Sequence, residues 1–319
     1  MARALRPLLV SALILALVIL VSSATLRLSA NGIGCKPWPA CYGLLETANQ
    51  AQGTSLIKVL RLTHRLTATI FAVLALVIVA LGWRGWAKPA KVFGLTLVLV
   101  TGLLAWVGLH TPSPLPLVTA VNVLGGLALV GLSAALLSVS PPPASSPTGN
   151  VSPFVRRAAW TLLAILALQA ALGAMISARL AASACALDCQ QLSWSADAAT
   201  LLNPLQSGRV ETLSSDLAAG QTLHWLHRIV GAVLLITVAT VVYVRGAAAG
   251  PNLSRLARVV AATFILGVVS AIWDGQLSST VLHVLLAGMA AAALGTTLMA
   301  VLRPRTTPSQ APRAPVDRA

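Results

Sequence analysis

Acidic residues are nearly absent from this chain. Seven Asp and Glu occur among its 319 residues, against 22 Lys and Arg, and charged residues of both signs amount to only 9%. A water-soluble domain of this size needs far more charge to cover its surface. Hydrophobic residues reach 57% and the mean hydropathy is +0.86, so the composition indicates an integral membrane protein.

Apolar stretches long enough to cross a membrane, which takes about 20 residues, recur along the chain. The first begins with basic residues, as a signal peptide does, but its apolar run is too long for one and no small-residue cleavage site follows it. We therefore predict eight transmembrane helices, approximately at residues 7–27, 56–82, 92–110, 115–138, 155–178, 219–244, 256–273 and 278–302.

The net charge of +15 would suit nucleic-acid binding, but its distribution indicates membrane topology instead. In an eight-span arrangement the basic residues gather on one side, which is the positive-inside pattern. We expect a multi-pass protein of the inner (cytoplasmic) membrane, in contact with lipid, with both termini cytoplasmic and no nucleic-acid partner. The residues concerned are Arg3, Arg6, Arg84, Lys88, Lys91, Arg156, Arg157, Arg245, Arg255, Arg258, Arg303, Arg305, Arg313 and Arg318.

Cysteine is scarce, and its four occurrences form two close pairs in the long outward loops. Cys35 and Cys41 fall in one loop, and Cys185 and Cys189 in the other. An outer compartment is oxidising, so each pair is compatible with a disulfide. Metal binding is the alternative, although neither loop adds a histidine to complete a site.

A Pro- and Ser-rich stretch, "SPPPASSPTGNVSP", divides the chain into two similar halves. In each half a loop with a cysteine pair precedes a helix with a His-Arg step, "LTHRLTATI" and "WLHRIVGAV". We predict an all-α membrane protein of two pseudo-symmetric four-helix bundles, at 1–139 and 155–302. A cytoplasmic linker at 140–154 joins them, and a cytoplasmic tail follows at 303–319.

Histidines inside spans are costly and mark candidate functional sites. His227 and His283 lie at similar depths, about 8–12 Å from the outer surface, in helices that run in the same direction. Two such imidazoles can fill both axial positions of a haem iron, with Arg228 on a haem propionate. The alternative is that each histidine bonds a neighbouring carbonyl. His224 either lines the same pocket or meets water, and His110 lies at an outward turn.

The first half repeats this arrangement incompletely. His64 and Arg65 form its His-Arg step, but Asn122 stands where the fourth helix would carry a second histidine. An amide is a poor axial ligand for haem iron. We therefore expect that, if this half binds a porphyrin, it does so through one imidazole or transiently.

Taken together, these residues resemble the haem A synthase family of the cytochrome oxidase assembly pathway, over about residues 10–302. "GCKPWPACYG" (34–43) is similar to that family's Cys-Pro-Asp-Trp-Pro-x-Cys loop after the first span. "THR" (63–65) and "LHR" (226–228) match its His-Arg steps in the second and sixth spans. "VLHVLLAG" (281–288) matches the histidine of its eighth span.

The resemblance implies a role for each half. The C-terminal bundle would hold haem b as a cofactor between His227 and His283. The N-terminal bundle would receive haem O at His64 and oxidise its C8 methyl group to the formyl group of haem A by successive hydroxylations. Haem O synthase and an electron donor are the implied partners, and self-association into a homo-oligomer stays open. Cys35 and Cys41 match a pair linked in the family to redox delivery or stability.

Two positions depart from the family pattern. Arg61 stands where active members carry a glutamate one turn before the first His-Arg step, and Asn122 replaces a histidine. A guanidinium can neither move a proton nor stabilise a developing cation as a carboxylate does. No acid lies within the first four predicted spans, and Glu46 in the first outer loop is the nearest. Catalytic residues are therefore not assigned, and Arg61 and Asn122 would orient the porphyrin.

Two other functions are compatible with the sequence. A non-catalytic haem b protein, active in electron transfer or assembly, would keep only the His227 and His283 site, in line with Arg61 and Asn122. A transporter also combines repeats with intramembrane histidines, but here the halves are parallel and no Gly- or Pro-broken helix pair occurs at mid-membrane.

Overall fold

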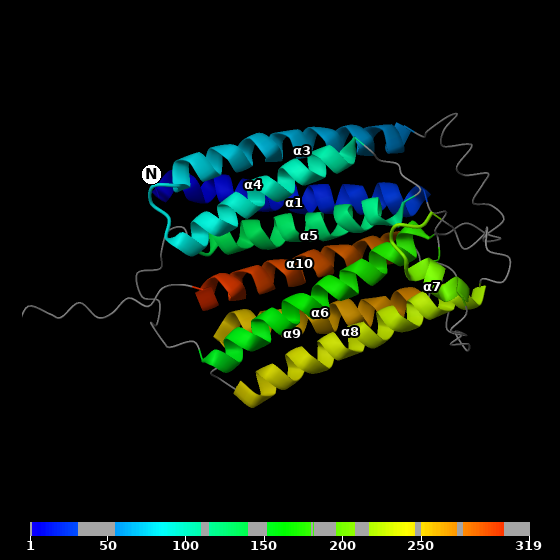
Figure 1. Ribbon diagram of the computed structural model, residues 1–319. Coiled ribbons are helices and arrows are strands. Elements are labelled where there is room, and N and C mark those ends of the chain that lie inside the picture. The colour runs from blue at the N-terminus through cyan, green and yellow to red at the C-terminus, as the bar shows by residue number, and fades with distance from the viewer. Residues whose placement is uncertain are drawn as a thin grey trace, which may run out of the picture.

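In the computed structural model, helices lie side by side in one elongated bundle (Figure 1). The structure describes residues 2–30, 55–109, 115–139, 152–179, 181, 196–207, 217–245, 250–272 and 277–302. Every regular element in these ranges is a helix. The helices are α1 (Ala2–Ala30), α3 (Ser55–Gly82), α4 (Lys88–Gly108), α5 (Pro116–Leu137), α6 (Pro153–Ala178), α7 (Ala196–Leu202), α8 (Leu217–Arg245), α9 (Gly250–Ile272) and α10 (Leu277–Leu302).

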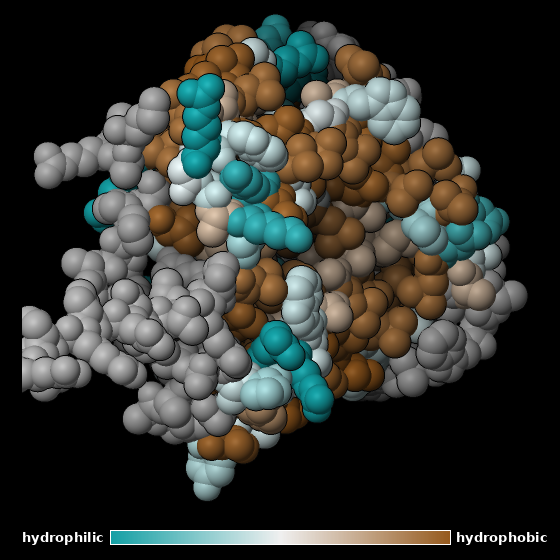
Figure 2. Space-filling model, turned by 60° about the vertical axis from the view of Figure 1, so that its left-hand side comes forward, coloured by the Kyte–Doolittle hydropathy of each residue, from teal (hydrophilic) through white to brown (hydrophobic). Residues whose placement is uncertain are grey.

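The chain is a multi-pass membrane protein. Within the described ranges, seven helices are long and apolar enough to cross a membrane: α1, α3, α4, α5, α6, α8 and α10. Their outward side chains are apolar, as lipid requires; Leu62 is 66% exposed and Ile236 64%. Most of the coloured surface in Figure 2 is accordingly hydrophobic. Helix α9 occupies the remaining predicted span but is not among the seven.

Proline and serine set several helix starts. Pro89, Pro116 and Pro153 stand in the first two positions of α4, α5 and α6, where a missing N–H costs nothing. Ser152 caps α6, because its Oγ accepts a hydrogen bond from the backbone N–H of Val155 at 3.3 Å. The predicted spans agree with the helices to within a few residues, except that α1, α4 and α9 begin four to six residues earlier than predicted.

The helices pack as two groups of four. In the first group, α1 and α4 each contact both α3 and α5. In the second, α6 and α9 each contact both α8 and α10. It follows that α3 and α5 are diagonal neighbours in one group, and α8 and α10 in the other.

Helices α5 and α10 join the two groups. Gly131 and Gly295 meet so closely that a Cβ atom at Gly295 would collide with the backbone carbonyl of Gly131. Small residues allow this backbone approach, on which helix association in lipid depends. On α10, Ala291 and Met299 belong to the apolar core of the first group, and Leu294 to that of the second.

The bundle has a basic end and a histidine end. Helices α3, α8 and α10 all begin at the end opposite the N-terminus (Figure 1). His64, His227 and His283 lie in the first halves of these helices. The exposed basic residues that flank the helices at the N-terminal end are Arg6, Arg84, Lys88, Arg156, Arg157, Arg255 and Arg258.

Candidate functional site

His227 and His283 come together across the second group of helices. Their ring centroids are 6.3 Å apart and their planes are inclined by 59°. The rings project from the diagonal helices α8 and α10, so they approach each other through the middle of the group. The structure thus unites the two histidines that the sequence predicted as a pair.

Helix α9 orients the imidazole of His283. Its Nδ1 donates a hydrogen bond to the backbone carbonyl of Thr263 at 3.0 Å, which leaves Nε2 with a free lone pair. Gly267, one turn further along α9, leaves room for the ring. A Cβ atom at Gly267 would lie 3.2 Å from Cε1 of His283.

Helix α6 makes the corresponding contacts with His227. The side-chain amide of Gln169 lies 3.1 Å from Nε2 of His227, and Nε2 accepts from this amide N–H. The proton of His227 is then on Nδ1. Within the described ranges, this buried atom has no hydrogen-bond partner, and neither has Oε1 of Gln169. Gly173 gives the ring its space, because a Cβ atom there would lie 3.2 Å from Cε1 of His227.

The spacing of the two rings fits an iron held from two sides, once the Gln169 amide turns away from the Nε2 lone pair of His227 that it occupies in this structure. Two imidazoles bound to one metal, each at about 2 Å, have ring centres roughly 6 Å apart, which agrees with the observed 6.3 Å. Nδ1 of His227 and Oε1 of Gln169 are a buried donor and a buried acceptor that lack partners among the described residues, and neither of them would itself ligate the iron. Among the described residues, no cluster of three or more His, Cys, Asp or Glu offers a rival metal site.

His224, one turn before His227 on α8, forms a hydrogen bond with the backbone near the end of α6. Its Nε2 donates to the backbone carbonyl of Ala181 at 2.7 Å. This bond adds a partner that the sequence did not predict, and the choice between a pocket-lining and a water-facing His224 stays open. Arg228, next to His227, is half-buried.

Arg179 ties the outer end of α6 to α7. Its side chain is fully buried. It donates to three backbone carbonyls, those of Thr200 (3.0 Å), Leu201 (3.2 Å) and Asn203 (2.7 Å). Burial lowers the pKa of Arg179. This residue packs α7 over the histidine end of α6 and α8.

The first group of helices contains one oriented histidine. Nδ1 of His64, on α3, lies 3.2 Å from Oγ of Ser22, on α1. Ser22 donates its own proton to the carbonyl of Ile19 at 3.2 Å, so it accepts from Nδ1 of His64. This bond leaves Nε2 of His64 available as a ligand.

The other residues predicted for this half are not gathered around His64. Arg61 and Arg65 are exposed on α3. Asn122 is half-buried on the diagonal helix α5, and within the described part of the chain no hydrogen bond links it to His64. Among the hydrogen bonds of the described residues, the one that joins a member of this set to α1 is that of His64.

Besides the tail arginines Arg303, Arg305, Arg313 and Arg318, six candidate site or loop residues singled out in the sequence lie outside the described ranges. They are Cys35, Cys41, Cys185, Cys189, His110 and Glu46. The two predicted disulfides and the proposed role of Glu46 therefore stay predictions.

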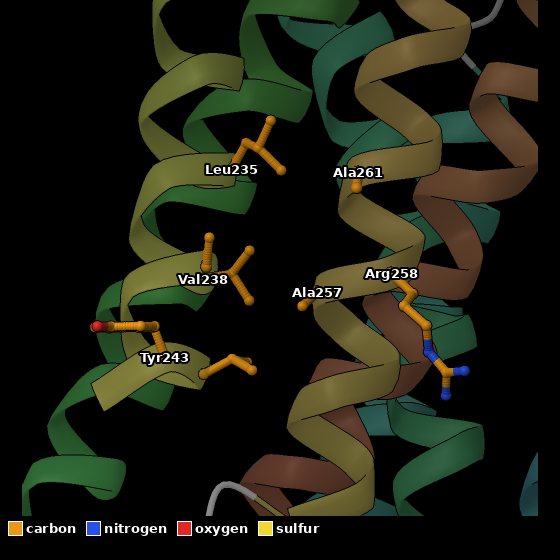
Figure 3. A pocket seen from close by; sticks show the side chains of 8 residues that line it. Leu235, Val238, Tyr243, Ala257, Arg258 and Ala261 are labelled. Carbon is orange, nitrogen blue, oxygen red and sulfur yellow. The ribbon is translucent and has the colours of Figure 1, made fainter. Parts of the chain in front are cut away.

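A separate groove of about 430 Å³ lies between α8 and α9, nearer the basic end. Figure 3 shows Leu235 and Val238 of α8 opposite Ala257 and Ala261 of α9. Its eight lining residues include no histidine: Leu235, Val238, Ala239, Val242, Tyr243, Ala257, Arg258 and Ala261. The groove is therefore distinct from the histidine pair.

Sequence reasoning missed several residues of both sites. Gln169 and Arg27 are polar groups in apolar stretches, so the criterion that singled out the histidines would also have found them. Ser22, Gly173 and Gly267 carry no such signal, because small residues occur throughout these helices.

Comparison with known proteins yields one family. The family model COX15-CtaA, described as cytochrome oxidase assembly protein, matches residues 6–295. No curated protein matches the chain.

Proposed function

The chain belongs to the COX15-CtaA cytochrome oxidase assembly proteins, the haem A synthase family, and we propose its function on that basis. Membership implies an oxidoreductase of the haem A synthase type with haem O as substrate. The specific proposal is conversion of haem O to haem A, by oxidation of the C8 methyl group to a formyl group through successive hydroxylations.

The observation that carries the proposal is the His227 and His283 pair, 6.3 Å apart between diagonal helices. These two imidazoles would hold haem b, and Arg228 would bind one of its propionates. Haem b bound there supplies one-electron transfer. Thr263 holds the ring of His283 so that Nε2 stays available, and Gly173 and Gly267 leave room for both rings.

In the N-terminal half, His64 is proposed to meet the iron of haem O. Ser22 fixes its imidazole with Nε2 unengaged. Arg65 would bind the substrate from the lipid-facing side of α3, while Arg61 and Asn122 would contact its periphery. Haem O synthase and an electron donor are the proposed partners.

The proposed architecture has two pseudo-symmetric bundles of four spans, at 1–139 and 155–302, with α9 as the seventh span. The diagonal placement of α3 and α5 in one group and of α8 and α10 in the other supports it. The basic residues at the N-terminal end support cytoplasmic termini in the inner membrane. Disulfides between Cys35 and Cys41, and between Cys185 and Cys189, complete the proposal.

A second candidate is a non-catalytic haem b protein that serves electron transfer or assembly. Arg61 favours it, because the family's glutamate is replaced by a cation, and so does Asn122, because an amide replaces an imidazole. This candidate retains the His227 and His283 site and lacks a productive site at His64.

Co-expression with a haem O synthase, followed by pigment extraction, chromatography and mass spectrometry, tests the proposal. We expect hydroxylated haem and haem A from the native chain. His64→Ala should abolish both while leaving a reduced b-type spectrum, and His283→Ala should remove that spectrum. His224→Gln, which keeps a donor for Ala181, is the matched control and should retain haem b.

The outcomes separate the candidates. A b-type haem without any oxidised product refutes the enzyme and supports the non-catalytic protein. A colourless protein after haem-replete expression refutes both.

A further inference from the structure

A buried cation near His64 has no role in the site described so far. Nε of Arg27, near the outer end of α1, is shielded from solvent and has no hydrogen-bond partner among the residues that the structure describes. A guanidinium left in this state inside a membrane protein is costly, and such groups mark ligand contacts.

Arg27 lies on the same helix as Ser22, the hydrogen-bond partner of His64. Ser22, five residues earlier on α1, accepts the hydrogen bond of the His64 imidazole. At about 1.5 Å of rise per residue, Arg27 stands roughly 7.5 Å further along α1 than Ser22. Arg27 and His64 therefore lie on neighbouring helices towards the same end of the bundle, because α1 and α3 pack against each other and Ser22 joins them at His64.

The helices of this half supply no counter-ion. Glu46 is the one acid among residues 1–139, and it lies outside α1, α3, α4 and α5. Arg61 and Arg65 add further positive charge on α3. An anion that enters with a ligand would satisfy this region.

We propose that Arg27 binds a carboxylate of the tetrapyrrole that occupies the N-terminal half. This inference rests on the proposed function, in which His64 meets the metal of that substrate. A guanidinium presents paired N–H donors that match a carboxylate, and propionates are the carboxylates of haem O. Arg27 would thus be a specificity-determining residue.

The substrate needs a second point of attachment, because the N-terminal half offers it one oriented imidazole, that of His64. A single metal–imidazole bond leaves a porphyrin free to rotate about that bond. A carboxylate held by Arg27 at the edge of the ring fixes the rotation, and with it the methyl group that is presented for reaction. Without this anchor, we expect weaker binding and mixed orientations.

The test uses the full-length protein in nanodiscs of neutral lipid, with haem b already in the C-terminal site. Binding of a second equivalent is measured by difference absorbance, with iron(III) protoporphyrin IX or its dimethyl ester as the probe. We expect Arg27→Gln to weaken binding of the diacid by about tenfold and to leave the diester within about twofold. Arg27→Lys should keep part of the affinity, because it keeps the charge. Arg84→Gln, the same change at an exposed site of the basic end, should have no effect.

Several outcomes overturn the inference. Equal losses for diacid and diester mean that Arg27 only supports the fold. If Glu46→Gln reproduces Arg27→Gln, the counter-ion belongs to the chain itself. If anionic lipid raises the thermal stability of the native chain but not of Arg27→Gln, with both probes bound alike, the ligand is a lipid phosphate.

The same binding experiment distinguishes failure of the proposed function from failure of the inference about Arg27. A native chain that binds no second equivalent of either probe removes the N-terminal haem site and this inference with it. A second equivalent that depends on His64 but not on Arg27 leaves the proposed function intact and refutes the inference alone.

Discussion

Gly267 of α9 and His283 of α10 are packed so closely that a Cβ atom added at Gly267 would lie 3.2 Å from Cε1 of the imidazole. Gly173 of α6 stands in the same relation to His227, also at 3.2 Å. Each imidazole therefore packs against a glycine. That glycine lies one helical turn after the residue that hydrogen-bonds the ring, Gln169 for His227 and Thr263 for His283. Both relationships lead to a direct prediction.

Replacement of Gly267 by leucine should displace the His283 ring and lower bound haem b to less than half of the native content. The new side chain claims the space of Cε1 and Nδ1 and competes with the bond to Thr263. Gly102→Leu is the matched control, because nothing lies within 4 Å of a Cβ atom there. Haem per polypeptide, from a pyridine haemochrome assay, gives the answer; equal contents in the two variants would contradict the prediction.

Removal of the Ser22 hydroxyl should weaken the N-terminal site selectively. Ser22→Ala takes away the acceptor of the Nδ1 proton of His64, a bond that contributes about 1 kcal/mol. We expect the affinity for the second porphyrin to fall roughly fivefold, with haem b in the C-terminal half unchanged. Ser23→Ala, the adjacent position on α1, is the control, and an identical fall in both variants would show a general effect on α1.

The contact between Gly131 and Gly295 should decide how firmly the two helix groups hold together. Gly295→Ala places a Cβ atom against the carbonyl of Gly131, so α5 and α10 must separate. Overpacking of this kind costs about 1–3 kcal/mol, and we expect a lower Tm in detergent. Gly108→Ala, where the added atom meets nothing within 4 Å, should leave Tm unchanged; an unaltered Tm for Gly295→Ala would refute this role of the contact.

Arg179 should be essential for the packing of α7. Arg179→Gln leaves carbonyls of Thr200, Leu201 and Asn203 without their shared donor in a buried position. Lost bonds of this kind cost about 2–4 kcal/mol. Arg157→Gln, at an exposed position on the same helix, is the comparison. Limited proteolysis near α7 should be faster in Arg179→Gln alone.

The sequence was a good guide to the helices and to one pair of residues. Long apolar runs and prolines such as Pro89 and Pro116 locate the helices, because length and a missing N–H are local properties. The meeting of His227 and His283 could be predicted, because equal depth in two helices of the same direction is a one-dimensional property.

Contacts around each helix were harder to predict. These helices are apolar on most sides, so periodicity does not say which face meets a neighbour. Arg65 is exposed although it follows His64, and His224 bonds Ala181 although it lies one turn from His227. Ser22 and Gln169 gain their roles only from helices distant in the sequence. Tertiary packing decides such contacts.

Asn122 gives the last prediction, because α5 and α3 occupy the diagonal positions that α10 and α8 occupy in the other group. Asn122→His would place a second imidazole opposite His64, as His283 stands opposite His227. We expect the N-terminal site to bind its porphyrin at least tenfold more tightly, with a low-spin absorbance spectrum typical of two nitrogen ligands. Asn122→Gln, which lengthens the side chain without adding an imidazole, should change neither property.

Combination with Arg61→Glu then tests whether the two departures limit catalysis. If they do, the double variant should yield more haem A than Asn122→His alone, because a carboxylate returns to the turn before His64. A low-spin spectrum without extra haem A would mean that iron ligation is restored and that the obstacle to oxidation lies elsewhere. An unchanged spectrum in Asn122→His would show that α5 does not present this position to His64.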